Sequence, residues 1–406
     1  FTPASTPRRM KEIRHIFTAL TFVALLTGTA EATAIRLPRP DSVLHSISRM
    51  APTDKPNPCP PIPDFSFQEP SDTEFERFTK GNFIAEEYHN TITPDAHFRR
   101  ARRGIIITGK GKNLRAMSPF GGSALMGEAY ASAVNEYKHL FGHKVNVYCM
   151  VIPTAVEYYC PDEARRHTQS EFAAINNIYT HLSDSVKAVD VYSALAKHAA
   201  EDIYLRTDHH WGALGAYYAA QEFAQVAEVP FRSIENYDSM TVRNFVGTMY
   251  KFSRDYSVKA AAEDFVYYVP RDVDYTTTYT EYRLNRNRKP IGESEPKQGP
   301  FFRSYPDGSP VAYCTFIGGD TNTTKVRTST KNGRRLLILK DSFGNALPGY
   351  LFYSFEEINI VDYRYFLKSM VNFVNDNGVT DILFANNNAH AHSGATSEAY
   401  MKFLKR

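Results

Sequence analysis

Short apolar runs rich in β-branched residues alternate with longer segments of helical spacing along most of the chain. The apolar runs predict strands over residues 104–108, 145–152, 186–191, 336–339, 358–361 and 381–384. Helical spacing predicts helices over residues 127–141, 161–182, 213–226, 345–353 and 365–375. This alternation is typical of an α/β fold in which a mostly parallel sheet carries helices on both faces.

The folded domain is expected over residues 70–406, with a β-rich insertion at about 228–335. Within that insertion, residues 265–270 and 275–282 are rich in tyrosine and threonine, and a charged turn follows at 283–289. The insertion separates the two motifs described below, so we expect it to form one wall of a cleft. Residues 35–69 are predicted to be a linker, because six prolines between positions 51 and 63 exclude a helix or a central strand.

Residues 1–34 have the pattern of a signal peptide. A basic stretch begins at Met10, residues 16–26 are mostly apolar, and Ala32-Thr33-Ala34 is a small-residue cleavage pattern. Residues 1–9 precede that start and are expected to have no role. The apolar run is well short of the roughly 20 residues that cross a bilayer, which favours cleavage over a retained membrane anchor. We therefore expect cleavage near Ala34 and a periplasmic, cell-surface or secreted protein.

Composition narrows the classes of protein further. The chain is 43% hydrophobic and 22% charged, as soluble globular proteins are. Its net charge is only +3, and residues 1–34 hold four basic and two acidic side chains, so nothing suggests a nucleic-acid partner. Four cysteines in an exported protein allow disulfides in three complete pairings, although Cys149 and Cys314 also fit as small buried residues.

Ser342 follows the apolar run 336–339 and precedes a predicted helix. It should therefore lie at the carboxyl end of a strand, the edge where open α/β sheets bind ligands. Backbone N–H groups at a helix start, including that of Ser342, can stabilise a developing oxyanion. The alternative is that Asp341 or Ser342 merely caps the helix.

Asp208-His209-His210-Trp211 precedes the predicted helix 213–226, so these side chains should lie in a loop or first turn. A serine hydroxyl needs a histidine base, and a carboxylate that orients the histidine improves it. As alternatives, Asp208 caps the helix, Trp211 packs in the core, or the histidines bind a metal. Among possible further metal ligands only His390 and His392 stand out, so we predict neither a metal nor a cofactor.

Several other residues are candidates for oxyanion or substrate binding. Gly318 and Gly319 follow the strand-like run 313–317, and glycine permits close backbone approach, although an ordinary turn explains the pair equally well. Asn345 can donate an amide hydrogen. Trp211 is expected beside the cleft. Arg206 and Arg364 are candidates for an anionic or hydroxylated substrate, with half-exposed ion pairs as the alternative.

The chain resembles the DHHW family of bacterial exported proteins, from the motif that begins at Asp208 and runs to Tyr218. Agreement continues at Val151-Ile152-Pro153-Thr154, at residues 245–250, at Ile317-Gly318-Gly319-Asp320, at residues 340–345 and at residues 361–366. That family is similar to the alginate O-acetylation proteins, whose SGNH-hydrolase-like, flavodoxin-like domains carry a D-x-H motif ahead of the serine motif. The resemblance implies that Asp208 orients, that His210 rather than His209 is the base, and that Ser342 is the nucleophile.

The family resemblance also implies an activity. Ser342 would accept an acetyl group, and a sugar hydroxyl or water would then take it, which makes the protein an O-acetyltransferase or acetylesterase of cell-surface polysaccharide. A membrane acyltransferase would deliver the acetyl donor. Only about twenty residues follow Asn386, too few for an appended carbohydrate-binding module, so alginate itself is not the expected polymer. The alternatives are a non-catalytic glycan-binding or scaffold protein and, without a G-x-S-x-G motif, a secreted lipase or peptidase.

Overall fold

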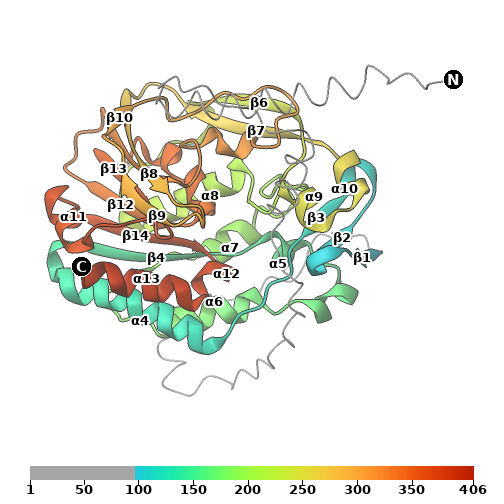
Figure 1. Cartoon of the computed structure of the whole chain (residues 1–406), viewed down its shortest axis with the longest axis horizontal. Helices are drawn as coiled ribbons and strands as arrows, with labels where there is room; N and C mark the ends of the chain where they lie inside the picture. The colour runs from blue at the N-terminus through green and yellow to red at the C-terminus, as the bar shows by residue number, and fades with distance from the viewer. Residues whose placement is uncertain (1–96) are drawn as a thin grey trace, which may run out of the picture. The chain divides into compact units, whose positions relative to one another are not determined.

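The computed structural model describes residues 97–406 (Figure 1). The predicted signal peptide, the predicted linker and the first part of the predicted domain lie outside the described residues. No described helix combines the length and apolar character that a membrane span requires. The described part is a mixed α/β fold built around one large sheet.

The large sheet has a parallel part and an antiparallel extension. Its parallel strands lie side by side in the order β5 (Lys187–Ala188), β4 (Asn146–Ile152), β14 (Asp381–Asn387), β12 (Arg335–Lys340) and β13 (Glu357–Asp362). Beyond β13 the sheet continues antiparallel through β11 (Asn322–Thr328), β8 (Tyr275–Leu284) and β10 (Lys297–Gln298), and β9 (Pro290–Glu293) also pairs with β8. Strands predicted at 145–152, 186–191, 336–339, 358–361 and 381–384 all fall in the parallel part.

Helices cover both faces of the parallel strands. Along β4, Val147, Cys149 and Val151 share one core with α4 (Ala124–Phe141), α6 (Glu171–Thr180), α11 (Met370–Asp376) and α13 (Gly394–Leu404). Alternate residues Tyr148 and Met150 share the opposite core with α7 (Val191–Ala196) and α8 (Ala213–Ala227). Figure 1 shows α4 and α13 on one side of the sheet and α8 on the other. Burial on both faces explains why these strands are continuous apolar runs in the sequence.

The segment 228–335 supplies several strands, and most of them extend the large sheet. Only β6 (Tyr237–Phe245) and β7 (Glu263–Pro270) form a separate two-stranded antiparallel sheet. Two short helices, α9 (Thr248–Ser253) and α10 (Tyr256–Ala260), connect them. Thr248, the first residue of α9, donates to the carboxylate of Asp208.

The strand predicted at 104–108 is confirmed as β2 (Ile106–Thr108), which pairs with β1 (Phe98–Arg100) and β3 (Arg115–Met117) in a small antiparallel sheet separate from the large one. Other predictions of local structure are wrong. The helix predicted at 345–353 is instead two 3-10 turns, η7 (Ser342–Ala346) and η8 (Pro348–Leu351), and Pro348 begins the second turn. Residues 313–317 are not a strand, since η6 (Ala312–Thr315) occupies most of them.

The remaining elements are short. The first half of the helix predicted at 161–182 is the 3-10 turn η4 (Asp162–His167), and α6 starts only after Ser170, whose side chain caps it. The other short helices and turns are η1 (Arg102–Gly104), η2 (Gly111–Asn113), η3 (Gly142–Lys144), α5 (Ala155–Tyr159), η5 (Ile234–Asn236) and α12 (Asn388–Ala391). Cys149, Cys160 and Cys314 are free thiols, and Cys59 lies outside the described residues.

Candidate active site

Ser342 opens η7 directly after β12, at the carboxyl edge of the parallel sheet, and it is half-buried. The preceding Asp341 is fully buried and fixes this turn. One of its carboxylate oxygens accepts from Phe343 N at 2.9 Å, and the other accepts from Asn387 N at 2.8 Å, at the end of β14. Asp341 is thus a cap, as the alternative interpretation had it, and this cap holds Ser342 in place.

Asp208, His210 and Ser342 form one hydrogen-bonded triad. His210 Nε2 lies 2.8 Å from Ser342 Oγ, and His210 Nδ1 lies 2.6 Å from Asp208 Oδ1. The backbone N–H of His210 also donates to Asp208 Oδ1, at 3.0 Å. A bridge between Tyr204 and Trp211 closes the loop that carries both residues. Both distances lie within hydrogen-bond reach, which is the geometry that activates a serine nucleophile.

The second oxygen of Asp208 is held by Thr248, the first residue of α9. Asp208 Oδ2 accepts from Thr248 N at 2.7 Å and from Thr248 Oγ1 at 2.9 Å. The neighbouring Gly247 has no room for a side chain, since a Cβ there would lie 2.3 Å from Asp208 Oδ2. Burial raises the pKa of Asp208, but His210 and these hydrogen bonds lower it by more than burial raises it. The pKa of Asp208 is therefore well below its ordinary value. The carboxylate therefore stays ionised.

Two aromatic side chains, Tyr313 and Trp211, hold the triad and the turn η7 in place. The ring of Tyr313 stacks on His210, and its hydroxyl donates to the carbonyls of Ser342 and Phe343, at 3.1 Å each. Trp211 Nε1 donates to the Phe343 carbonyl at 3.0 Å. Trp211 is 0% exposed, so the expectation that it contacts substrate is wrong. Trp211 is a core residue that holds η7, the turn that begins at Ser342.

A cluster of charged side chains lies at the carboxyl ends of β12 and β13. Lys340 is fully buried, and its Nζ lies 3.0 Å from Asp362 Oδ2 and 3.6 Å from Asp320 Oδ1. Arg364 pairs with the same two carboxylates, at 2.6 Å and 3.0 Å, and Asn345 Nδ2 donates to Asp320 at 2.8 Å. Burial raises the pKa of Asp320, but Lys340 and Arg364 bring it well below its usual value. Asn345 and Arg364 therefore belong to one ion-pair network at the carboxyl edge of the parallel strands.

Gly318 and Gly319 belong to a tight turn rather than to a strand end. Ile317, Gly318 and Gly319 all have positive φ. The N–H of Gly318 donates to Cys314 O at 3.1 Å, and that of Gly319 donates to Phe316 O at 3.4 Å. Both N–H groups are thus bonded within the turn, which corrects the expectation that they are free to bind an oxyanion. The ordinary-turn alternative describes these glycines better.

The guanidinium of Arg206 contacts residues outside the triad. Its guanidinium donates to the Lys112 carbonyl and lies 3.7 Å from Glu263. With Glu201, Asp202 and Glu263 it lines a cavity of about 680 Å³, and neither Ser342 nor His210 is part of that lining. Of the two candidate arginines, only Arg364 lies at the serine edge of the sheet.

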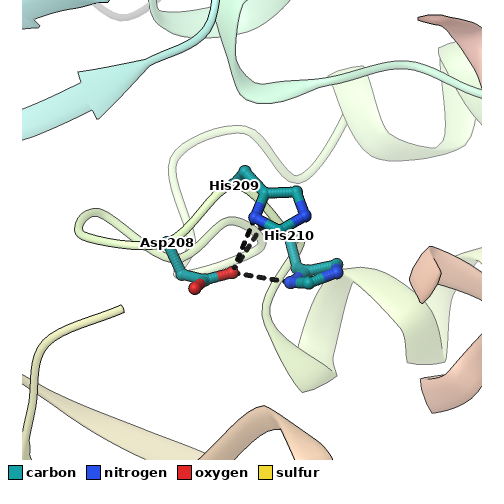
Figure 2. A group of neighbouring side chains, drawn as sticks. All are labelled: Asp208, His209 and His210. Carbon is teal, nitrogen blue, oxygen red and sulfur yellow. Dashed lines mark hydrogen bonds and ion pairs between the residues drawn. The ribbon is translucent and has the colours of Figure 1, made fainter. Parts of the chain in front are cut away.

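Asp208, His209 and His210 have the composition of a metal site, and their ligand atoms lie within 4.8 Å of one another (Figure 2). The two Nδ1 atoms already have hydrogen-bond partners, because His210 Nδ1 binds Asp208 and His209 Nδ1 binds Thr248 Oγ1 at 2.6 Å. The two further histidines weighed as ligands also have partners, Tyr363 for His390 and the Asn388 carbonyl for His392. The geometry fits a hydrogen-bonded triad, and a metal would compete with it.

Sequence reasoning did not single out Thr248, Gly247, Tyr313 or Lys340 for the site. The first two lie in the stretch 245–250 that carried part of the family resemblance, so a signal for them existed. Tyr313 has no such signal, because the run 313–317 has the apolar pattern of a strand. Lys340 had one: a lysine at the end of a fully apolar strand must find a buried counter-charge.

Comparison with known proteins places this geometry in context. The model of the family described as "DHHW protein" matches residues 115–361, more than half of the chain. The crystal structure of a DHHW family protein from Eubacterium siraeum is 38% identical, covers 75% of this chain and 97% of that chain, and superposes with a TM-score of 0.66. These two findings confirm the resemblance stated from the motifs.

PatB1, a more distant relative in sequence, shares the fold. PatB1 from Bacillus cereus is 19% identical, with 72% of this chain and 99% of that chain covered and a TM-score of 0.55, and it has also been solved with a sulfonyl adduct. The O-acetyltransferase domain of Pseudomonas putida AlgJ matches at 12% identity over 77% of this chain and 99% of that chain, but its TM-score of 0.33 is too low to argue from. No curated protein gave a significant sequence match.

Proposed function

The chain belongs to the DHHW protein family, and from that premise we propose that it is an extracytoplasmic, serine-dependent O-acetyltransferase or acetylesterase that acts on cell-surface polysaccharide. The observation that carries the proposal is the unbroken hydrogen-bond chain from Asp208 through His210 to Ser342. The fold would be the SGNH-hydrolase type, with the serine block after the histidine block. Export would follow cleavage near Ala34.

Acylation is the first half of the proposed reaction. Ser342 Oγ bonds to the acetyl carbonyl carbon of the donor while its proton passes to His210 Nε2. The donor's ester oxygen then leaves with that proton, and an acetyl ester on Ser342 remains. Asp208 holds the Nδ1 proton of His210 throughout and stabilises the transient imidazolium, without being protonated itself. We expect a membrane acyltransferase to present the donor.

Deacylation reverses these roles with a different oxygen. A sugar hydroxyl bonds to the acetyl carbon and gives its proton to His210, the bond to Ser342 Oγ breaks, and Ser342 regains the proton. If water replaces the sugar, the product is acetate and the protein acts as an esterase.

The oxyanion of each step needs hydrogen-bond donors. The backbone N–H of Ser342 at the start of η7 is the candidate, since the N–H groups of Gly318 and Gly319 are bonded within their own turn. Lys340 and Arg364 supply positive charge beside this edge, although both are already paired with Asp320 and Asp362. No step of this reaction calls for a metal or a cofactor.

Turnover of 4-nitrophenyl acetate by the purified protein tests the proposal. We expect Ser342→Ala to lower kcat/KM by about 10³-fold or more, because the substitution removes the nucleophile. Ser185 is an exposed serine far from Ser342 in the sequence, so Ser185→Ala is the matched control and should leave turnover unchanged.

A covalent probe separates the enzyme from a non-catalytic glycan-binding or scaffold protein, which would form no acyl-enzyme. Since PatB1 has been solved with a sulfonyl adduct, phenylmethanesulfonyl fluoride is the reagent, and peptide mass spectrometry should place the adduct on Ser342. Equal turnover by the wild type and Ser342→Ala, together with no labelling of either, would reject the proposed function.

A further inference from the structure

His209 lies beside the triad but has no part in the reaction proposed above. Its ring centroid is 3.7 Å from that of His210, and its side chain is 29% exposed whereas Asp208 is only 3% exposed. Figure 2 shows the two imidazoles side by side, each with one nitrogen toward Asp208 and the other on the far side. The outward nitrogen of His210 is Nε2, which bonds to Ser342. His209 thus presents its own Nε2 next to the base.

The hydrogen bonds around Thr248 fix the tautomer of His209. An ionised Asp208 can only accept, so the Thr248 hydroxyl must donate its single hydrogen to Asp208 Oδ2. The Thr248 oxygen must then accept from His209, at 2.6 Å, which puts a proton on His209 Nδ1. In a neutral imidazole the other nitrogen carries a lone pair. His209 Nε2 is therefore a hydrogen-bond acceptor.

The His209 side chain is partly exposed, at 29%. Within residues 97–406 no group bonds to His209 Nε2, and it is not among the buried polar atoms that lack a partner. Loss of solvation and the neighbouring His210 lower the pKa of His209 to about 4, so its ring stays neutral above about pH 5. Phe252 packs at 5.6 Å from the ring and Arg103 lies over Phe252, which gives the acceptor a partly apolar rim.

We propose that His209 Nε2 binds a second hydroxyl of the acyl acceptor, next to the hydroxyl that attacks the acetyl ester. The acceptor class is then a molecule with hydroxyls on adjacent carbons, as sugars have. This inference rests on the proposed function, since it needs the acetyl-serine intermediate. His210 removes the proton of the attacking hydroxyl, whereas His209 accepts a hydrogen bond and no proton. His209 binds substrate and does not serve as the base.

Two substitutions separate this role from a structural one. In His209→Asn the amide NH₂ can replace Nδ1–H toward Thr248, but nothing replaces Nε2. In His209→Gln the longer amide reaches the position of Nε2. The assay forms the acetyl-enzyme from 4-nitrophenyl acetate, follows the initial nitrophenolate burst, and compares acetyl transfer to propane-1,2-diol with transfer to propan-1-ol.

We expect the wild type to favour the diol. His209→Asn should keep the burst but lower the diol preference by about fivefold to tenfold, the value of one hydrogen bond of roughly 1 kcal/mol. His209→Gln should recover part of the preference. An unchanged preference in His209→Asn, or loss of the burst in both variants, would overturn the inference and leave the triad standing. A wild-type protein without any burst would instead remove the proposed function, and this inference with it.

Discussion

The phenol ring of Tyr313 lies flat on the imidazole of His210, with ring centroids 3.8 Å apart and planes 5° from parallel. The same side chain donates from its hydroxyl to the carbonyls of Ser342 and Phe343. Tyr313 thus joins the base to the backbone of the serine turn, so the two ends of the 2.8 Å bond between His210 and Ser342 are held by one residue. In the proposed reaction, this aromatic face would also stabilise the imidazolium that forms when His210 takes the serine proton.

Tyr313→Ala should lower kcat for 4-nitrophenyl acetate by about tenfold to a hundredfold, because it removes a cation–π contact of roughly 1 kcal/mol and the packing that orients His210. Tyr313→Phe keeps the stacked ring and loses only the hydroxyl bonds, so its kcat should stay within about fivefold of the wild type. Steady-state kinetics measure both. Tyr256→Ala, at a tyrosine that is 76% exposed, is the control. Equal losses in the Phe and Ala variants would contradict a role for the ring.

The position next to Thr248 gives a second prediction. Gly247→Ala places a methyl group within 2.3 Å of Asp208 Oδ2, a distance that no real Cβ contact tolerates. The carboxylate must shift away from His210, and we expect kcat to fall by about a hundredfold, as when a catalytic group moves by about 1 Å. Thermal unfolding shows whether the fold survives. Gly121→Ala is the matched control, since the nearest atom to a Cβ there is 3.9 Å away. If Gly247→Ala keeps the kcat of the wild type, the Asp208 carboxylate can move aside without loss of activity, and this prediction is wrong.

How far the sequence predicts this fold depends on what buries each segment. The strands at 336–339 and 358–361 were found to within a residue or two, because burial on both faces leaves an unambiguous apolar run. The helix at 213–226 was found because its apolar spacing begins directly after Gly212. At 345–353 the apolar spacing was misleading, because the segment forms two 3-10 turns and the second of them begins at Pro348.

The candidate site likewise contains residues that the sequence predicts and residues that it does not. Asp208, His210 and Ser342 were selected by residue type and family motif, and the structure brings them within hydrogen-bond distance. The supporting residues Thr248 and Tyr313 come from the segment 228–335, and no local pattern tells which of its side chains return to the triad. Trp211 was misplaced because an aromatic residue in a catalytic motif suits a substrate platform and a core equally well, and only the fold decides.

Away from the triad, two buried carboxyl groups predict an unusual dependence of stability on pH. Glu171 is fully buried and accepts from Thr154 Oγ1 at 2.5 Å and Thr154 N at 2.9 Å. Burial, and repulsion from the buried Glu157, raise the pKa of Glu171 to about 8. The folded protein therefore keeps a proton that the unfolded chain releases at its ordinary pKa of about 4.3.

The sign follows from proton binding. Between about pH 5 and pH 8 the folded state binds more protons than the unfolded state, so the free energy of unfolding falls as the pH rises, by up to about 1.4 kcal/mol per pH unit for this group. Glu171→Gln carries no titrating proton and should lose most of that slope, so its melting temperature should exceed that of the wild type most clearly near pH 8. Thermal unfolding from pH 5 to pH 8 measures the difference. Glu136→Gln, at an exposed glutamate, should run parallel to the wild type. If Glu171→Gln also runs parallel, Glu171 does not hold its proton in the folded protein.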